Sequence, residues 1–373
     1  MIEPRVIVGA GLAGSAAALL LARAGQPPLL LERTASVRPR LCGEFVSAEA
    51  TQILLQLGVD VLALGGRPTR RLRLASGRDL IEAELPFTAV GLTRHALDGA
   101  LQQQAASAGA RLLRGHRVAV QRVATTTEPF ELALSEGRNL HCATLLLATG
   151  KTDLAPLARR PQRPPEPLVG LRLHLRLAPT QARAIEGHVE VLLTADGYAG
   201  LQPVEGDKVN LCLLLQRESA GARPEALLQM LRSQSPLLAE RLEGAVTLPE
   251  APEMIYRVPY GYLHRAHASD PPGLWRLGDQ AAVIPSFTGD GMAIALHSAT
   301  LAVAMLLEGT TAARYHRQLH ADVAAQVGRA LWLYRLGRRP WGRGLLLRLL
   351  RTRPQLLGFI AAMTRVPASA LRL

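Results

Sequence analysis

The clearest indication of the fold is the sequence Arg5-Val6-Ile7-Val8-Gly9-Ala10-Gly11-Leu12-Ala13-Gly14. Its apolar start predicts a short buried strand, and a GxGxxG pattern follows that strand without a gap. The Ala- and Leu-rich segment 15–24 predicts a helix that ends at Gly25, and residues 28–32 predict a second strand whose last residue is Glu32. The order strand, glycine-rich turn, helix, strand and acidic residue predicts a dinucleotide-binding unit.

Each glycine of this turn has its own physical task. Gly9 permits the tight turn, Gly11 lets the backbone approach a pyrophosphate, and Gly14 lets the helix pack on the strand. Leu12 and Ala13 lie between the last two glycines, where the free N–H groups of the helix N-terminus face the phosphates. We therefore expect all five residues to contact the cofactor.

The end of the second strand adds charged groups to this unit. Glu32 is expected to accept a hydrogen bond from a ribose hydroxyl. Arg33, Arg38 and Arg40 follow within reach of the pyrophosphate. These features do not separate FAD from NAD, so the choice of cofactor depends on a second segment.

That second segment lies far downstream and reads Leu274-Trp275-Arg276-Leu277-Gly278-Asp279-Gln280-Ala281-Ala282, then Pro285-Ser286-Phe287-Thr288-Gly289-Asp290-Gly291-Met292. It resembles the GDAA…P…G.G segment of FAD enzymes in the superfamily of para-hydroxybenzoate hydroxylase and geranylgeranyl reductase. The resemblance implies FAD as the cofactor and Asp279 as a ligand of its ribityl chain. It also implies a turn beside the flavin, with the residues Pro285, Gly289, Gly291 and Met292. A helix N-terminus at this turn stabilises the negative charge of a reduced flavin.

Two shorter matches stand in the family order. The stretch 91–101 resembles the R..LD..L helix, which implies that Arg94 lies near the cofactor. Leu41-Cys42-Gly43-Glu44-Phe45 resembles a Cys-Gly-acidic segment of the reductase branch; Cys42 is then either close to substrate or flavin, or a small buried thiol. The resemblance implies an α/β fold, in which a Rossmann-like FAD-binding domain is interleaved with an antiparallel-sheet substrate domain and followed by a C-terminal helical extension.

The expected domain boundaries follow from these matches. The FAD-binding domain is expected over residues 1–48, 92–165 and 264–310, the substrate domain over 49–91 and 166–263, and a basic amphipathic helical extension over 311–373.

The substrate domain is expected to contain a strand over residues 170–177. Leucines alternate there with Arg172, His174 and Arg176, which predicts a sheet with one buried and one exposed face. The resemblance implies that this sheet roofs the substrate cavity. His174 and Tyr198 are the candidate catalytic residues, each as an acid, a base or a hydrogen-bond donor. The alternatives are a histidine on the sheet surface and a tyrosine that only packs.

Fold alone does not decide the reaction. Gly200 and Gln202 replace two large aromatics of the reductase-branch Y.W.FP pattern, which suggests a roomier cavity. The Asp-Gly pair found in many hydroxylases is missing from residues 148–153, which argues against direct use of NAD(P)H. The halogenase Trp-x-Trp-x-x-Pro pattern is absent, and the three cysteines lack metal-ligand spacing, so no metal is expected.

We expect an FAD-dependent oxidoreductase that acts on a hydrophobic aromatic or unsaturated molecule of the polyketide, quinone or prenyl type. A monooxygenase is narrowly favoured. The alternatives are a carbon–carbon double-bond reductase of the geranylgeranyl reductase type and a quinone-linked electron-transfer flavoprotein. The candidate electron donors are NAD(P)H and a separate flavin reductase.

Charge is concentrated at the C-terminal end. The chain has 373 residues and a net charge of +13, while residues 329–373 hold ten Arg and no Lys, Asp or Glu. The remaining 328 residues therefore carry only +3. A content of 48% hydrophobic and 20% charged residues excludes disorder for most of the chain. Lys151 and Lys208 are the only lysines, which we attribute first to genome composition.

The basic end has an amphipathic pattern. Its four leucines Leu345, Leu346, Leu349 and Leu350 are predicted to share one helical face, and Trp332 and Trp341 lie nearby. This pattern fits a peripheral membrane surface, a dock for an acidic carrier protein, or helices that simply pack on the body. Nucleic acid is not expected as a partner. We expect a cytoplasmic protein, with the inner membrane face as a candidate peripheral location.

Overall fold

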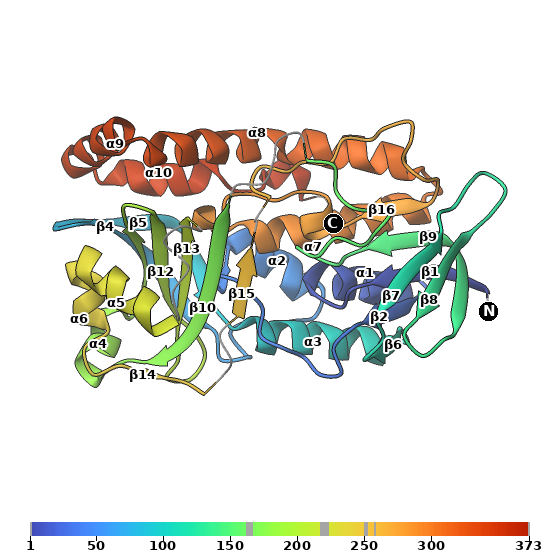
Figure 1. Ribbon diagram of the computed structural model, residues 1–373, viewed down its shortest axis with the longest axis horizontal. Coiled ribbons are helices and arrows are strands. Elements are labelled where there is room, and N and C mark those ends of the chain that lie inside the picture. The colour runs from blue at the N-terminus through green and yellow to red at the C-terminus, as the bar shows by residue number, and fades with distance from the viewer. Residues whose placement is uncertain (1, 162–166, 217–223, 250–252, 257–258, 372–373) are drawn as a thin grey trace.

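The computed structural model describes residues 2–161, 167–216, 224–249, 253–256 and 259–371. Two β-sheets lie next to each other in this fold, and a layer of C-terminal helices covers both of them along one side (Figure 1). The predicted α/β fold is therefore confirmed: a Rossmann-like half, an interleaved second sheet and a helical extension.

The first sheet is the nucleotide-binding half of the fold. Its strand order is β6-β2-β1-β9-β8-β7, with β16 beside β9, and β7 and β8 are its antiparallel members. The strands are β1 (Ile2–Val8), β2 (Leu29–Glu32), β6 (Arg111–Arg114), β7 (Val118–Arg122), β8 (Phe130–Leu134), β9 (Asn139–Leu147) and β16 (Leu274–Arg276). Helices α1 (Leu12–Arg23), α3 (Arg94–Ser107) and α7 (Gly291–Leu307) pack together beside it. Small side chains on α1 allow this close packing, because Ala16, Ala17 and Ala18 are fully buried.

The second sheet has the order β14-β10-β13-β12-β11-β4-β5-β3, with β15 beside β10. Its strands are β3 (Phe45–Val46), β4 (Arg67–Ser76), β5 (Asp79–Gly91), β10 (Leu168–Arg176), β11 (His188–Leu193), β12 (Gly197–Pro203), β13 (Val209–Gln216), β14 (Val246–Thr247) and β15 (Glu253–Tyr256). The neighbours are antiparallel apart from the parallel pair β11 and β4. Its helices are α2 (Ala48–Gln56), α4 (Pro179–Ala184), α5 (Pro224–Gln234) and α6 (Pro236–Arg241).

Strand β10 differs from its predicted half-buried state. Arg172 and His174, on the row predicted to face solvent, are 0% and 3% exposed. The physical reason is the segment Leu41–Glu44, which lies over this row: the Asn210 side chain on the neighbouring strand donates to the Cys42 carbonyl at 2.9 Å. At Arg172 and His174 the polar face of β10 is thus an internal wall, whereas Arg176 at the end of the strand is exposed as predicted.

The C-terminal helices α8 (Ala312–Arg338), α9 (Pro340–Thr352) and α10 (Gln355–Met363) form the covering layer (Figure 1). Their predicted apolar face divides in the structure. Leu346 and Leu350 pack against the second sheet, whereas Leu345 and Leu349 are exposed. Among the described residues, none of the helices combines the length and apolarity needed to cross a membrane.

Candidate active site

The glycine-rich turn between β1 and α1 has the geometry that the sequence predicted. Gly9 has φ +104°, and a Cβ there would lie 2.4 Å from the Ala148 carbonyl oxygen. A Cβ on Gly14 would lie 1.9 Å from the Gly9 oxygen. Gly11 has open space beside it, with Arg94 Nη2 as the nearest atom at 3.6 Å. Two glycines are therefore needed for packing, and the third leaves backbone accessible to a ligand.

Glu32 closes this turn from the end of β2. Its carboxylate accepts from Ala10 N–H at 3.0 Å and from the Thr34 hydroxyl at 2.9 Å. Burial acts to raise the pKa of Glu32, but these hydrogen bonds and the Arg40 charge outweigh it and lower the pKa below its ordinary value. The residue therefore stays an anion, as an acceptor for ribose hydroxyls must.

Arg33 and Arg40 lie away from the main cavity. Together with Arg38 and Arg117 they line a separate, polar cavity of about 320 Å³ beyond the end of β2. Arg40 also forms an ion pair with Glu32 at 3.3 Å. The sequence grouped Arg33, Arg38 and Arg40 with the pyrophosphate. The structure brings them together at this second cavity, and their contact with the pyrophosphate stays a prediction.

Arg94 lies over the glycine-rich turn from the start of α3. Its guanidinium pairs with the buried Asp98 at 2.9 Å, which holds the side chain along the first turn of the helix. Thr93 caps the helix, and Glu205 accepts from the Thr93 hydroxyl at 2.6 Å. Arg94 thus presents a fixed positive charge beside Gly11, which suits a pyrophosphate.

The downstream segment forms the opposite rim. Asp279 lies in a 3-10 turn, where Lys151 Nζ is 3.2 Å from its carboxylate, and the Asp279 charge raises the pKa of Lys151. Gly289 has φ +69°, and a Cβ there would lie 2.6 Å from the Phe45 ring. Gly291 and Met292 begin helix α7 and line the cavity, as Gly289 and Asp279 do.

Pro285 is placed behind this rim. It is buried at the start of the second 3-10 turn, and its carbonyl accepts from the Thr288 hydroxyl at 2.9 Å. Pro285 therefore shapes the rim without lining the cavity.

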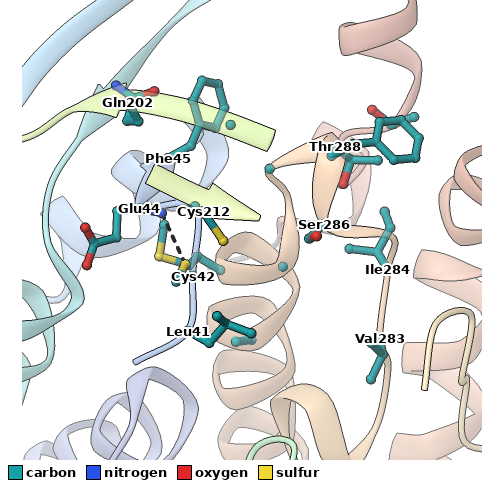
Figure 2. A pocket seen from close by; sticks show the side chains of 18 of the residues that line it. Leu41, Cys42, Glu44, Phe45, Gln202, Cys212, Val283, Ile284, Ser286 and Thr288 are labelled. Atoms are coloured by element: carbon teal, nitrogen blue, oxygen red, sulfur yellow. Dashed lines mark hydrogen bonds between the residues drawn. The ribbon is translucent and has the colours of Figure 1, made fainter. Parts of the chain in front are cut away.

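A cavity of about 310 Å³ joins the two rims to the second sheet. At one end it is lined by Gly11, Leu12, Ala13, Arg94, Asp279 and Met292. At the other end its walls are aliphatic and come from four strands and α10: Leu72, Leu74, Leu85, Val189, Val191, Leu213, Leu214, Leu357, Ile360 and Ala361. Figure 2 shows Cys42, Cys212 and Phe45 on one side of this cavity and Val283, Ile284 and Ser286 across from them.

A cluster of three hydroxyl groups lies in the wall of this cavity. Tyr198 Oη lies 3.1 Å from Tyr260 Oη, and both phenols hydrogen-bond with Ser286. Burial raises the pKa of Tyr198 well above its ordinary value. The phenol therefore stays protonated at neutral pH and lines the cavity beside Tyr260 and Ser286.

His174 reaches the cavity only through Glu44. Its Nε2 lies 2.6 Å from Glu44 Oε2, and Glu44, with φ +56°, is a fully buried carboxylate that lines the cavity. Arg172 Nη1 lies 2.9 Å from both ring nitrogens of His174. His174 is thus positioned to orient Glu44, and its catalytic role stays a prediction.

Several residues of this site were missed by sequence reasoning. Lys151 could have been found, because it is one of two lysines in a chain whose other cations are arginine. Ser286 stood inside the quoted downstream segment without a role. Glu44 stood in the quoted Cys-Gly-acidic segment without a role of its own. Tyr260 and Arg365 carried no local signal, since the fold alone brings them to the cavity.

Comparison with known proteins supports this geometry. Residues 4–145 match the family model described as FAD binding domain. A menaquinone reductase of Mycobacterium tuberculosis is 28% identical over 329 residues, which cover 85% of this chain and 79% of that protein. A menaquinone reductase of Mycolicibacterium smegmatis is 26% identical over 317 residues, covering 82% and 76%.

Solved structures show the same fold. The flavin-dependent brominase Bmp2 superposes with a TM-score of 0.76 at 14% identity, covering 100% of this chain and 96% of that one. PqsL of Pseudomonas aeruginosa, described as a probable FAD-dependent monooxygenase, superposes with a TM-score of 0.70 at 19% identity, covering 92% and 98%. The chain thus contains an FAD-binding domain over residues 4–145, shares the fold of these flavin-dependent enzymes, and is an FAD-dependent oxidoreductase.

Proposed function

We propose that this flavoprotein reduces a carbon–carbon double bond in the isoprenoid chain of a lipid, such as a prenylated quinone. The observation that carries the proposal is the cavity: it is lined by residues of both predicted flavin-binding segments, by aliphatic side chains and by the hydroxyl cluster. The similarity to proteins named menaquinone reductase supports a lipid quinone as the substrate class. This proposal prefers the reductase alternative to the monooxygenase that the sequence narrowly favoured.

The residues of both rims fit FAD. Gly11, with the adjoining start of α1, and Arg94 would hold the pyrophosphate, because open backbone and a fixed cation meet there. Glu32 would accept from the ribose, and Asp279 would bind the ribityl chain. When bound and reduced, FAD supplies a hydride, and the protein must therefore supply the matching proton.

Tyr198 is the proposed proton donor. The reduction adds a hydride to one alkene carbon and a proton to the other, so the Tyr198 O–H bond breaks as the new C–H bond forms. Ser286 hydrogen-bonds Tyr198 and is exposed, so it can return a proton from solvent to the phenolate. The aliphatic walls orient the chain and exclude water from the reacting carbons.

Substitution of Tyr198 tests this role. We expect Tyr198→Phe to lower the rate at which a prenyl lipid reoxidises the reduced, FAD-loaded enzyme under argon by about a hundredfold, the usual scale of one general acid. The matched control is Tyr256→Phe, because Tyr256 is 59% exposed on β15 and does not line the cavity. The measurement is stopped-flow absorbance of the flavin.

Two results would contradict the assignment. One is an unchanged rate in Tyr198→Phe, and the other is an equal loss in Tyr256→Phe. A product that gains an oxygen atom and forms only in air would instead show that the protein is a monooxygenase. Reduction of the quinone ring with an unchanged side chain would show that the protein is a quinone-linked electron-transfer flavoprotein.

A further inference from the structure

We infer that the outer face of α8–α10 is a docking surface for an anionic lipid bilayer, and that α10 forms the wall between this bilayer and the substrate cavity. The docking surface consists of the exposed residues Arg329, Trp332, Arg335, Arg338, Arg339, Trp341, Leu345, Arg348, Leu349, Arg351, Arg353 and Phe359. The bilayer binding stands on its own observations. Its use for substrate delivery rests on the proposed function.

Exposed apolar side chains are concentrated on these helices. Trp332 and Trp341 are each 61% exposed, Leu345 59% and Phe359 64%. Arginines lie beside them on the helix surface: Arg335, for example, is three residues after Trp332 in α8 and lies on the same side of the helix. Large exposed apolar groups beside cations are typical of helices that lie in a membrane interface, where Trp sits at headgroup level.

The charge of this face suits anionic headgroups. Residues 329–373 contain ten Arg and no acidic residue, and Arg335, Arg348 and Arg353 are exposed. Two arginines of this segment do not belong to the surface: Arg365 is buried and pairs with Asp290 at 3.2 Å, and the half-buried Arg343 donates to the Thr194 carbonyl at 2.8 Å. The sequence had counted Arg365 with the basic face. Arg351 also pairs with Asp79 at 3.4 Å. The net charge of the docking surface therefore remains strongly positive.

Helix α10 connects this surface to the cavity. Its inner side chains Leu357, Ile360 and Ala361 line the cavity, and Thr364 just after its end does so too, while Phe359 on the same helix is exposed. The helical layer that carries the arginines therefore also contributes to the cavity wall. A bilayer on this face places lipid chains one helix away from the aliphatic chamber, which favours a substrate drawn from the membrane.

A binding experiment with vesicles tests the docking surface. We expect the FAD-loaded full chain to float with phosphatidylglycerol vesicles, and not with phosphatidylcholine vesicles, in a salt-dependent way. A triple variant should have a vesicle affinity that is roughly a hundredfold lower, because each arginine near an anionic surface increases the affinity about fivefold. The variant combines Arg335→Gln, Arg348→Gln and Arg353→Gln. The control Arg138→Gln/Arg176→Gln/Arg183→Gln removes three exposed charges from other elements and should bind normally.

A second pair of variants tests whether the exposed apolar side chains insert into the bilayer. Trp341→Ser/Phe359→Ser should reduce binding at high salt, whereas Leu55→Ser/Leu62→Ser, which alters exposed leucines near α2, should not. Each variant is checked for its bound-flavin spectrum. Equal loss in the control variants, or binding to an acidic carrier protein with none to phosphatidylglycerol vesicles, would overturn the proposal. Vesicle binding is read without turnover, so a failed reductase assay leaves this result intact.

Discussion

Individual glycines define the cofactor turn more strictly than any other residues. Gly14→Ala places a Cβ 1.9 Å from the Gly9 oxygen, so we expect a loss of about 2–4 kcal/mol in the free energy of unfolding and of bound FAD. Gly99→Ala lies inside α3 with nothing within 4 Å of the added Cβ, and should stabilise the protein by about 0.5–1 kcal/mol. Urea denaturation and flavin absorbance measure both. An unchanged unfolding free energy and FAD content in Gly14→Ala would contradict the geometry.

Asp290 predicts a pH dependence of stability. Burial raises its pKa to about 7, although Arg365 and the Val366 N–H oppose this. The unfolded state has the ordinary carboxyl value near 3.8, so the folded state binds the proton more tightly. This stabilisation is complete below the unfolded pKa and is lost as pH rises through 7.

Asp290→Asn removes this titration. We expect the wild-type free energy of unfolding to fall between about pH 4 and about pH 8 more steeply than that of Asp290→Asn. Chemical denaturation at several pH values measures the two slopes. Parallel slopes would show that Asp290 stays ionised beside Arg365.

At the scale of elements, helix α10 has one buried face and one exposed face. Leu357 is 6% exposed and packs toward the sheet, so Leu357→Ala should cost about 2–4 kcal/mol of unfolding free energy. Phe359 is 64% exposed, so Phe359→Ala should change it by less than about 0.5 kcal/mol. Denaturant midpoints of the two variants test this contrast. Similar losses would mean that α10 packs in another orientation.

The sequence predicted those parts of the fold that depend on neighbouring residues. The strand, glycine turn and helix at 5–24 are local, and each was found within a few residues of its observed bounds. The burial of β10 was not predictable, because the covering segment Leu41–Glu44 is distant in the chain. Tyr260 and Ser286 likewise meet Tyr198 only through tertiary folding.

At the scale of the whole molecule, the two sheets and the helical layer share one cavity. The nucleotide half supplies the rim at Gly11 and Asp279, the second sheet supplies aliphatic walls, and α10 closes the outer side. The basic charge of the chain is thus concentrated on the helical layer whose inner side chains line this cavity.

The mass of the product that the reduced enzyme forms under argon shows whether the protein reduces a carbon–carbon double bond of the prenyl side chain. The FAD-loaded protein is reduced and mixed with a prenylated quinone, and the side chain is then analysed by mass spectrometry. Our account predicts a side chain that has gained two hydrogen atoms for each reduced flavin consumed, without oxygen. A side chain that stays unsaturated under argon and gains an oxygen atom in air would contradict it.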